Sequence, residues 1–212
     1  MKLHTYWRSS AAYRVRIALE WKGLAWEPAF RHLAKGEQRA PDYLALNPQG
    51  LIPALEDGGR VLTQSLATIE YLDETHPEPP LLPRTPPERA EVRAMAQAIA
   101  CDVHPLANLR VLGYLRGPLA QPETQVTAWI RHWIGEGFRA LELLAQRHSA
   151  DGRTLYGREV TLADVCLVPQ LYNARRFGTD LAPYPTLVGI GAALEQRPAF
   201  ARARPEAQPD AE

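Results

Sequence analysis

The sequence predicts two domains, an α/β domain over residues 1–80 and an all-helical domain over residues 88–212. Three observations support this fold class. The chain opens with a short alternating strand, a turn and an apolar helical run. Six prolines lie between Pro77 and Pro87, and a segment so poor in backbone donors is typical of a linker. Beyond them, apolar residues recur every three or four positions, which is the spacing of buried helical faces.

The stretch from Trp7 to Leu19 passes from the strand through two serines into the first helix. Ser9 or Ser10 supplies the hydroxyl that caps the first amides of that helix. A helix N-terminus stabilises an anion placed against it, including a thiolate. No cysteine lies in this stretch, so a thiolate that acts here must belong to a bound molecule, with Ser9 donating its O–H to the sulfur. For the serines taken alone, an ordinary helix cap is the simpler interpretation.

The remaining elements up to residue 80 follow from strand and turn signals. The first helix is apolar on more than one side, so we expect two neighbours to cover it. Strands are expected at 26–30, 52–55 and 60–63, and helices at 37–45 and 65–74, the last with Ser65 as its N-cap. Pro53 opens a strand, where it indicates a chain turn and permits a cis bond. The order βαβαββα, with proline opening the third strand, resembles the thioredoxin-like fold.

Four helices are expected in the second domain, over about 88–115, 123–146, 161–171 and 184–196. Pro105 should kink the first, because it removes a backbone hydrogen bond and crowds the preceding turn. Gly135 and Gly137 would let a neighbour approach the second closely. Thr161 and Asp164 form a capping box at the start of the third. The tail after 198 is too polar and proline-rich to fold by itself.

Composition argues against several classes of function. Lys plus Arg and Asp plus Glu both number 24, so no overall field attracts nucleic acid or an acidic membrane. No segment approaches the ~20 apolar residues of a membrane span, and we expect a cytoplasmic protein. Cys101 and Cys166 lie far apart in apolar helical patterns. We expect both to be buried reduced thiols, with no disulfide and no metal site.

Motifs that follow one another along essentially the whole chain carry a family resemblance. In the first half they are Arg8-Ser9-Ser10, Tyr13-Arg14-Val15-Arg16-Ile17-Ala18-Leu19, Leu46-Asn47-Pro48, Ile52-Pro53 and the run from Gln64 to Leu72. In the second half they are Asp102-Val103-His104-Pro105, Asn108-Leu109-Arg110, Thr161-Leu162-Ala163-Asp164, Leu167-Val168-Pro169-Gln170, Arg176-Phe177 and Gln208-Pro209-Asp210. The sequence thus resembles the zeta class of glutathione S-transferases. The resemblance implies that family's two-domain architecture, glutathione as cofactor and a homodimer. Ala11 stands where family members often have cysteine, so no mechanism that needs that thiol operates here.

The resemblance also implies a glutathione site in the first domain. Gln64 and Ser65 match the pair that holds the γ-glutamyl end, and a hydroxyl at a helix N-terminus suits its α-carboxylate. An ordinary N-cap is the alternative for Ser65. Ile52, before Pro53, matches the residue whose main chain pairs with the cysteinyl backbone of glutathione.

Three further polar residues, Gln38, His104 and Asn108, match positions that approach glutathione in relatives. His104 and Asn108 are four residues apart, which places them on one face of the expected helix. A hydrogen bond across the kink at Pro105 explains His104 equally well.

The activity implied by the resemblance is glutathione-dependent cis–trans isomerisation of maleylacetoacetate, in the degradation of tyrosine and phenylalanine. Maleylpyruvate of the gentisate pathway is the alternative substrate, and a general glutathione transferase is a third possibility. A non-catalytic interaction module of the same fold belongs to another class, but a module has no need for a thiolate donor beside a carboxylate clamp.

Both substrates are cis-dicarboxylates, so arginines are the natural residues to hold them. Arg176 matches the family's carboxylate-binding arginine, Arg8 precedes the thiolate serine, and Arg110 continues an otherwise apolar stripe. A surface charge is the alternative for Arg8, and a packed stem with its head in water is the alternative for Arg110. With Ser9 and Ser10, these arginines are the candidate catalytic residues.

Overall fold

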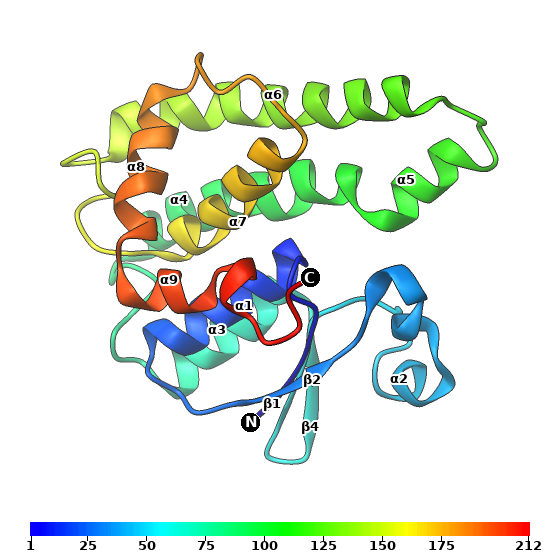
Figure 1. Cartoon of the computed structure of the whole chain (residues 1–212). Coiled ribbons are helices and arrows are strands. Elements are labelled where there is room, and N and C mark those ends of the chain that lie inside the picture. The colour runs from blue at the N-terminus through cyan, green and yellow to red at the C-terminus, as the bar shows by residue number, and fades with distance from the viewer. The chain divides into compact units, whose positions relative to one another are not determined.

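The computed structural model describes residues 1–212 and divides into two compact units. Unit 1 holds Met1–Pro80 together with Gln196–Glu212, and unit 2 holds Leu81–Glu195. The sequence-based assignment puts the C-terminal segment in the helical domain, and here the structure differs. The segment folds as α9 (Pro198–Ala203) and a 3₁₀ turn (Pro205–Ala207), and α9 packs on α1 (Ser10–Trp21) of unit 1. Figure 1 shows both chain ends in this unit.

Unit 1 is built on a four-stranded sheet of order β2-β1-β3-β4. β1 (Lys2–Thr5) pairs in parallel with β2 (Glu27–Phe30) and antiparallel with β3 (Ala54–Asp57). β3 in turn forms an antiparallel hairpin with β4 (Arg60–Thr63). Strands β1, β2 and β4 therefore run in one direction and β3 in the other. The predicted thioredoxin-like domain is confirmed.

Two helices cover α1, as its apolar circumference predicts. α3 (Ser65–Thr75) and α9 both pack against it, and Val15, Ile17 and Leu19 are fully buried. The weak helix expected at 37–45 is interrupted: Glu37–Arg39 is a 3₁₀ turn, and α2 runs from Pro41–Leu46. Proline opens α2 because its missing N–H costs nothing at a first helical position.

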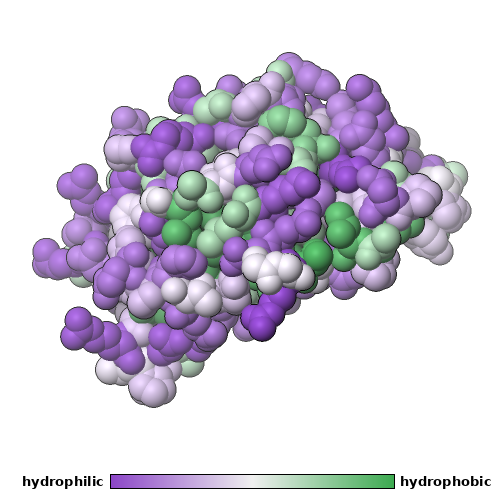
Figure 2. Space-filling model, turned by 90° about the horizontal axis from the view of Figure 1, so that it is seen from below, coloured by the Kyte–Doolittle hydropathy of each residue, from purple (hydrophilic) through white to green (hydrophobic).

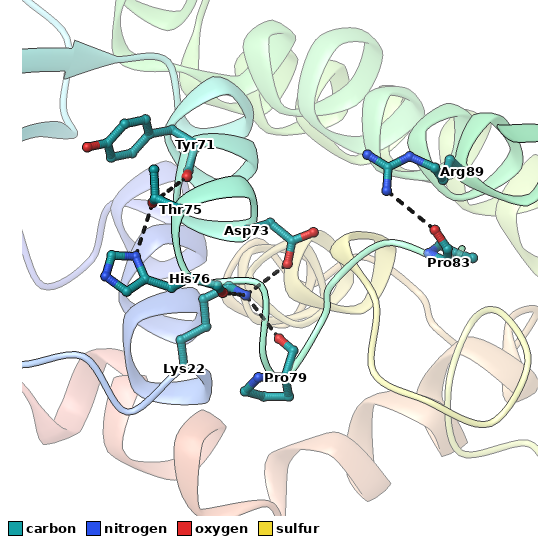
Figure 3. Close-up of polar contacts among 8 residues, drawn as sticks. All are labelled: Lys22, Tyr71, Asp73, Thr75, His76, Pro79, Pro83 and Arg89. Carbon is teal, nitrogen blue, oxygen red and sulfur yellow. Dashed lines mark hydrogen bonds and ion pairs between the residues drawn. The ribbon is translucent and has the colours of Figure 1, made fainter. Parts of the chain in front are cut away.

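The end of α1 is tied to the end of α3 by Lys22 (Figure 3). Its side chain is fully buried, and Nζ donates to Asp73 Oδ1 at 2.8 Å, to the His76 carbonyl at 2.7 Å and to the Pro79 carbonyl at 2.9 Å. An ammonium group has three N–H donors, and all three are used here. This contact holds the path of the chain where it leaves α3 for the proline-rich segment.

Unit 2 contains five α-helices: α4 (Pro86–Gln97), α5 (Leu109–Arg116), α6 (Glu123–His148), α7 (Leu162–Arg176) and α8 (Pro185–Glu195). α7 is buried along most of its length and packs against α4 and α8. The predicted capping box is present, with Asp164 accepting from the Thr161 backbone N–H at 2.7 Å. A Cβ at Gly137 would overlap Val103, so the close approach expected along α6 is confirmed there.

The single kinked helix expected over 88–115 is wrong. α4 ends at Gln97, a π turn (Ala98–Val103) and a 3₁₀ turn (His104–Ala107) follow, and α5 begins afresh. Pro105 supplies no donor and crowds the turn before it, which favours a break. The Asn108 side chain then caps the new helix, accepting from the N–H groups of Arg110 and Val111 at 2.9 and 3.3 Å.

The surface is mostly hydrophilic, with scattered apolar residues. Figure 2 shows one face on which separate apolar patches interrupt a polar surface. The large exposed apolar side chains are Phe30, Leu44, Val61, Leu109, Tyr114, Leu119 and Leu143. Cys166 is buried as expected, but the π turn leaves Cys101 exposed, and neither cysteine forms a disulfide. None of the helices combines the length and the apolar content that crossing a bilayer requires.

Candidate functional site

The predicted site residues of unit 1 gather at one edge of its sheet. β1 and β4 run in the same direction, so α1 and α3, which follow them, both begin at this edge. β3 runs the other way, and its Ala54 pairs with His4 near the end of β1. Ile52 and Pro53, just before Ala54, therefore lie at the same edge. Two helix N-termini and one strand start are thus brought together, and helix N-termini attract anions.

Ser9 is the N-cap of α1. Its backbone is extended, and its Oγ accepts a hydrogen bond from the Ala12 N–H at 3.2 Å. Because the oxygen acts as the acceptor, the hydroxyl hydrogen can point to an anion at the helix start. The capping interpretation and the thiolate interpretation are therefore compatible. Ser10 is the first helical residue and is buried, so it is the less accessible of the two.

Gln64 has an unusual backbone at the start of α3. Its φ of 68° lies in the left-handed region, which a non-glycine residue rarely adopts. Such conformations cost free energy and cluster at binding and active sites. The Gln64 side chain donates from Nε2 to Gln49 Oε1 at 2.9 Å. This bond links the turn at 47–50 to the helix start.

Ser65 is the first residue of α3, and the expectation that it is the N-cap is wrong. Gln64 occupies the cap position, because its positive φ turns the chain one residue earlier. The Ser65 hydroxyl instead accepts a hydrogen bond from Arg14 Nη1 at 3.3 Å. Arg14, from α1, is 1% exposed, so it brings a buried positive charge to the start of α3.

The Ile52-Pro53 peptide bond is cis, as the sequence suggested. The turn before it is held from two sides, because the Tyr43 hydroxyl and Asn47 Nδ2 both donate to the Leu51 carbonyl, at 2.6 and 2.8 Å. This arrangement leaves the Ile52 main chain at the end of a defined turn.

Gln38 lies in the 3₁₀ turn Glu37–Arg39, and its Oε1 is buried without a hydrogen-bond partner. A buried acceptor without a donor is costly, which makes it a good partner for an N–H group of a ligand. Arg8 is half-buried, and its guanidinium carbon lies 4.9 Å from the centre of the Trp7 ring. Arg8 is therefore stacked on an aromatic ring rather than extended into solvent.

The predicted residues of unit 2 fall in separate elements. His104 begins the 3₁₀ turn and Asn108 caps α5 with an extended backbone (φ −82°, ψ 161°), so they do not share a helical face. That expectation is wrong because the helix expected there is broken. Arg110 lies exposed in the first turn of α5. Arg176 is the exposed last residue of α7, and its guanidinium lies 4.8 Å from the Phe177 ring centre.

Sequence reasoning missed the buried arginines of α1 as functional candidates. Arg16 is 0% exposed, and burial lowers the pKa of its guanidinium to about 10, against the opposing effects of Tyr13 and Asp210. The signal was present in the sequence, because Arg14 and Arg16 interrupt an otherwise apolar helical run. A charge inside such a run requires partners.

Comparison with known proteins agrees with this geometry. Residues 3–80 match the family model described as "Glutathione S-transferase, N-terminal domain". A probable maleylacetoacetate isomerase of Vibrio cholerae is 53% identical, over 99% of this chain and 97% of its own. A solved holo maleylpyruvate isomerase, described as a bacterial zeta-class enzyme, is 46% identical, with a TM-score of 0.98 and 100% coverage of both chains. The chain belongs to the zeta-class glutathione S-transferases.

A second zeta-class neighbour, a maleylacetoacetate isomerase from Methylobacterium extorquens AM1, was solved with malonate and glutathione bound. It is 43% identical, has a TM-score of 0.96 and covers 100% of both chains. The two-domain glutathione S-transferase architecture predicted from the sequence is confirmed. In this chain the zeta-class fold brings a hydroxyl and two helix N-termini to one edge of the sheet, an arrangement that can hold a thiolate and a carboxylate.

Proposed function

We propose that this chain is a glutathione-dependent cis–trans isomerase of the maleylacetoacetate type. One observation carries the proposal: Ser9 caps α1 with its oxygen and so keeps its hydroxyl hydrogen for an anion at the helix start. Without a cysteine nearby, the anion is the sulfur of a bound thiol. The start of α3 at the same sheet edge suits the carboxylate of that same molecule.

The residues of unit 1 fit glutathione. The backbone of Gln64 and the hydroxyl of Ser65 would hold the γ-glutamyl carboxylate, with the buried charge of Arg14 behind them. The main chain of Ile52 would pair with the cysteinyl backbone, as in strand addition. The unpartnered Oε1 of Gln38 supports this fit, because glutathione offers N–H donors.

The family resemblance assigns two residues of unit 2, His104 and Asn108, to glutathione. Asn108 uses its Oδ1 to cap α5, so toward glutathione it acts only as a donor, through its NH₂ group. His104 begins the preceding 3₁₀ turn and is the second polar contact in this proposal.

Bound glutathione supplies a thiolate nucleophile whose reversible addition makes the substrate's central double bond single and free to rotate. Ser9 and the α1 N-terminus keep the sulfur ionised by hydrogen bonding and by the helix dipole. Arg176, Arg8 and Arg110 hold the substrate carboxylates and stabilise negative charge that develops on the ketone oxygen. Glutathione is regenerated, so the net reaction is isomerisation.

The deciding experiment compares kcat/KM for maleylacetoacetate and maleylpyruvate, each with and without glutathione. We expect the rate with one or both substrates to require glutathione without consuming it. Faster turnover of maleylpyruvate would favour the second candidate, for which the neighbour with a TM-score of 0.98 is the supporting observation. A chain that binds immobilised glutathione but isomerises neither substrate would contradict the proposal and favour an interaction module.

The proposal includes a homodimer and a cytoplasmic location. Exposed apolar side chains in both units, such as Val61 and Tyr114, are available to an interface between copies. The two cysteines form no disulfide and one of them is exposed, which suits a reducing compartment.

A further inference from the structure

The connection between β1 and α1, which carries Ser9, is held by the far end of the chain. The backbone N–H of Trp7 donates to Asp210 Oδ2 at 3.0 Å, across 203 residues of sequence. Gln208 folds the segment that presents this carboxylate, because its Nε2 donates to the carbonyls of Arg202 and Arg204 at 2.9 and 3.1 Å. All of these residues lie in unit 1.

The other side of the same connection is held by Arg16 of α1. Its Nη2 donates to the Trp7 carbonyl at 2.9 Å, and its Nη1 donates to the Tyr6 carbonyl at 3.3 Å. Its Nε donates to the Ala203 carbonyl of α9 at 3.0 Å. One fully buried guanidinium therefore joins the β1–α1 connection to the C-terminal segment.

Both polar groups of the Trp7 main chain are thus bonded to charged side chains, the N–H to Asp210 and the C=O to Arg16. Hydrogen bonds to ionised groups are shorter and stronger than neutral ones. Ser9 lies two residues further on, and its own N–H donates to the Tyr6 carbonyl at 3.0 Å. Fixing Trp7 therefore fixes the approach to Ser9.

A role in stability alone does not explain Asp210 well. Its Oδ2 accepts the Trp7 N–H, but its Oδ1 is buried without a hydrogen-bond partner. The nearby charge of Arg16 compensates part of the cost of burying this carboxylate, but an oxygen buried without a hydrogen bond is still unfavourable for folding. A positioning role for Asp210 would account for this cost.

We propose that Asp210 and Arg16 are positioning residues that hold the Trp7–Ser9 connection in place, so that the Ser9 hydroxyl meets the glutathione sulfur. This inference rests on the proposed role of Ser9. It adds Asp210 and Arg16 to the residues that support Ser9, although neither of them needs to contact the sulfur.

The test uses Asp210→Ala, Asp210→Asn and, as a matched control, Glu206→Ala, which removes an exposed acid from the same segment. Asparagine keeps an oxygen that can accept the Trp7 N–H, whereas alanine does not. The first measurement is amide hydrogen exchange over Trp7–Ser9 in the protein alone. The second is the pKa of the bound glutathione thiol, followed by the ultraviolet absorbance of its thiolate.

We expect Asp210→Ala to speed amide exchange at Trp7 about tenfold or more, because the opened connection exchanges by local fluctuation. It should also raise the pKa of the bound thiol and lower kcat by about tenfold or more, since small misplacements have large effects on rate. Affinity for glutathione should change little. Asp210→Asn should restore exchange and thiol pKa toward wild type, and Glu206→Ala should change neither.

Ser9→Ala, measured in parallel, separates the proposed role of Ser9 from the proposed positioning role of Asp210. If Ser9→Ala leaves the thiol pKa and turnover unchanged, the proposed role of Ser9 is wrong. If Ser9→Ala raises the thiol pKa but Asp210→Ala behaves like Glu206→Ala, only the positioning role is overturned. It is also overturned if Asp210→Asn is as defective as Asp210→Ala, because the charge and not the hydrogen bond to Trp7 would then matter.

Discussion

Ser9 uses one hydroxyl for two purposes, because its oxygen caps α1 while its hydrogen serves the proposed thiolate. Ser9→Ala should lower the isomerisation rate by roughly 10²-fold or more, as the loss of one preorganised donor to a catalytic anion does elsewhere. Glutathione should still bind. Steady-state kinetics at saturating glutathione measures the effect, and Ser9→Thr, which keeps a hydroxyl, is the matched control.

The lost cap also destabilises α1 by about 1 kcal/mol, so activity is compared well below the melting temperature. Near-wild-type turnover of Ser9→Ala would remove Ser9 from the mechanism, and Ser10 would be tested next.

Substitution of Arg176 tests whether the substrate carboxylate needs a planar partner or only a positive charge. Arg176→Lys keeps the charge but loses the fork that meets a carboxylate with two parallel hydrogen bonds. We expect kcat/KM to fall about tenfold or more, on the order of 1.4 kcal/mol, with affinity for glutathione little changed.

Kinetics of the lysine and alanine variants decides the role of Arg176. Wild-type rates for both would show that it is not the clamp. A collapse of glutathione binding alone would assign it to the cofactor site.

Glu56 of β3 links stability to pH through its hydrogen bond to His4 on the neighbouring strand β1. His4 Nε2 lies 2.7 Å from Glu56 Oε1, and this hydrogen bond holds the pKa of the Glu56 carboxyl below its usual value. A lowered folded-state pKa stabilises the fold above the unfolded-state pKa, about 4.3 for glutamate, and this contribution is lost as the pH falls through the folded-state value.

Glu56→Gln should therefore destabilise the protein near neutral pH, by less than about 1 kcal/mol because the carboxylate is partly exposed. The difference from wild type should disappear in acid. Denaturant unfolding at neutral pH and in acid measures this difference in the free energy of unfolding, with Glu206→Gln as an exposed control. An effect that is larger in acid would contradict the assignment.

At the scale of elements, Lys22 at the end of α1 joins Asp73 of α3 and the chain that leaves α3 (Figure 3). Lys22→Met keeps the length of the side chain but removes the three hydrogen bonds that Nζ donates to the Asp73 carboxylate and to two carbonyls. We expect a loss of about 3–5 kcal/mol in the free energy of unfolding, typical of breaking a buried ion pair.

Arg89→Met is the comparison for Lys22→Met. Arg89 donates to the Pro83 carbonyl at 3.4 Å, which is long for a hydrogen bond. Its loss should cost well under about 1 kcal/mol. Equal losses for the two variants, measured by denaturant unfolding, would show that the three bonds of Lys22 carry no special weight.

At the scale of the whole molecule, the proposed homodimer is tested by sedimentation at micromolar concentration. We expect a species of twice the 23.7 kDa chain mass, because closed two-fold pairing is the commonest assembly of like chains. Val61→Glu and Tyr114→Glu, each in a different unit, should weaken the dimer if these exposed apolar residues lie in the interface. A species of 23.7 kDa for the wild type would contradict the proposal.

Several features of this protein were readable from the sequence because their causes are local. The serine cap of α1, the cis bond before Pro53 and the capping box at Thr161 each depend on residues within a few positions of one another. The proline-rich segment and the helical periodicity beyond it are local signals of the same kind. Ordered motifs along the chain were enough to identify the family.

Other features were decided only by the tertiary structure. Ser65 lost the cap position to Gln64, whose positive φ no local propensity favours. Asn108 became the cap of α5 instead of sharing a helical face with His104, because the break at Pro105 is complete rather than a bend.

The hydrogen bonds that hold Trp7 show most clearly what the sequence alone does not predict. Asp210 reaches Trp7 across 203 residues, and such a pairing leaves no periodic trace in either segment. The sequence determined which local elements form and which chemistry the chain carries. Only the folded chain decided which distant charges hold the Ser9 connection, because a buried charge takes its partner from the elements that packing brings to it.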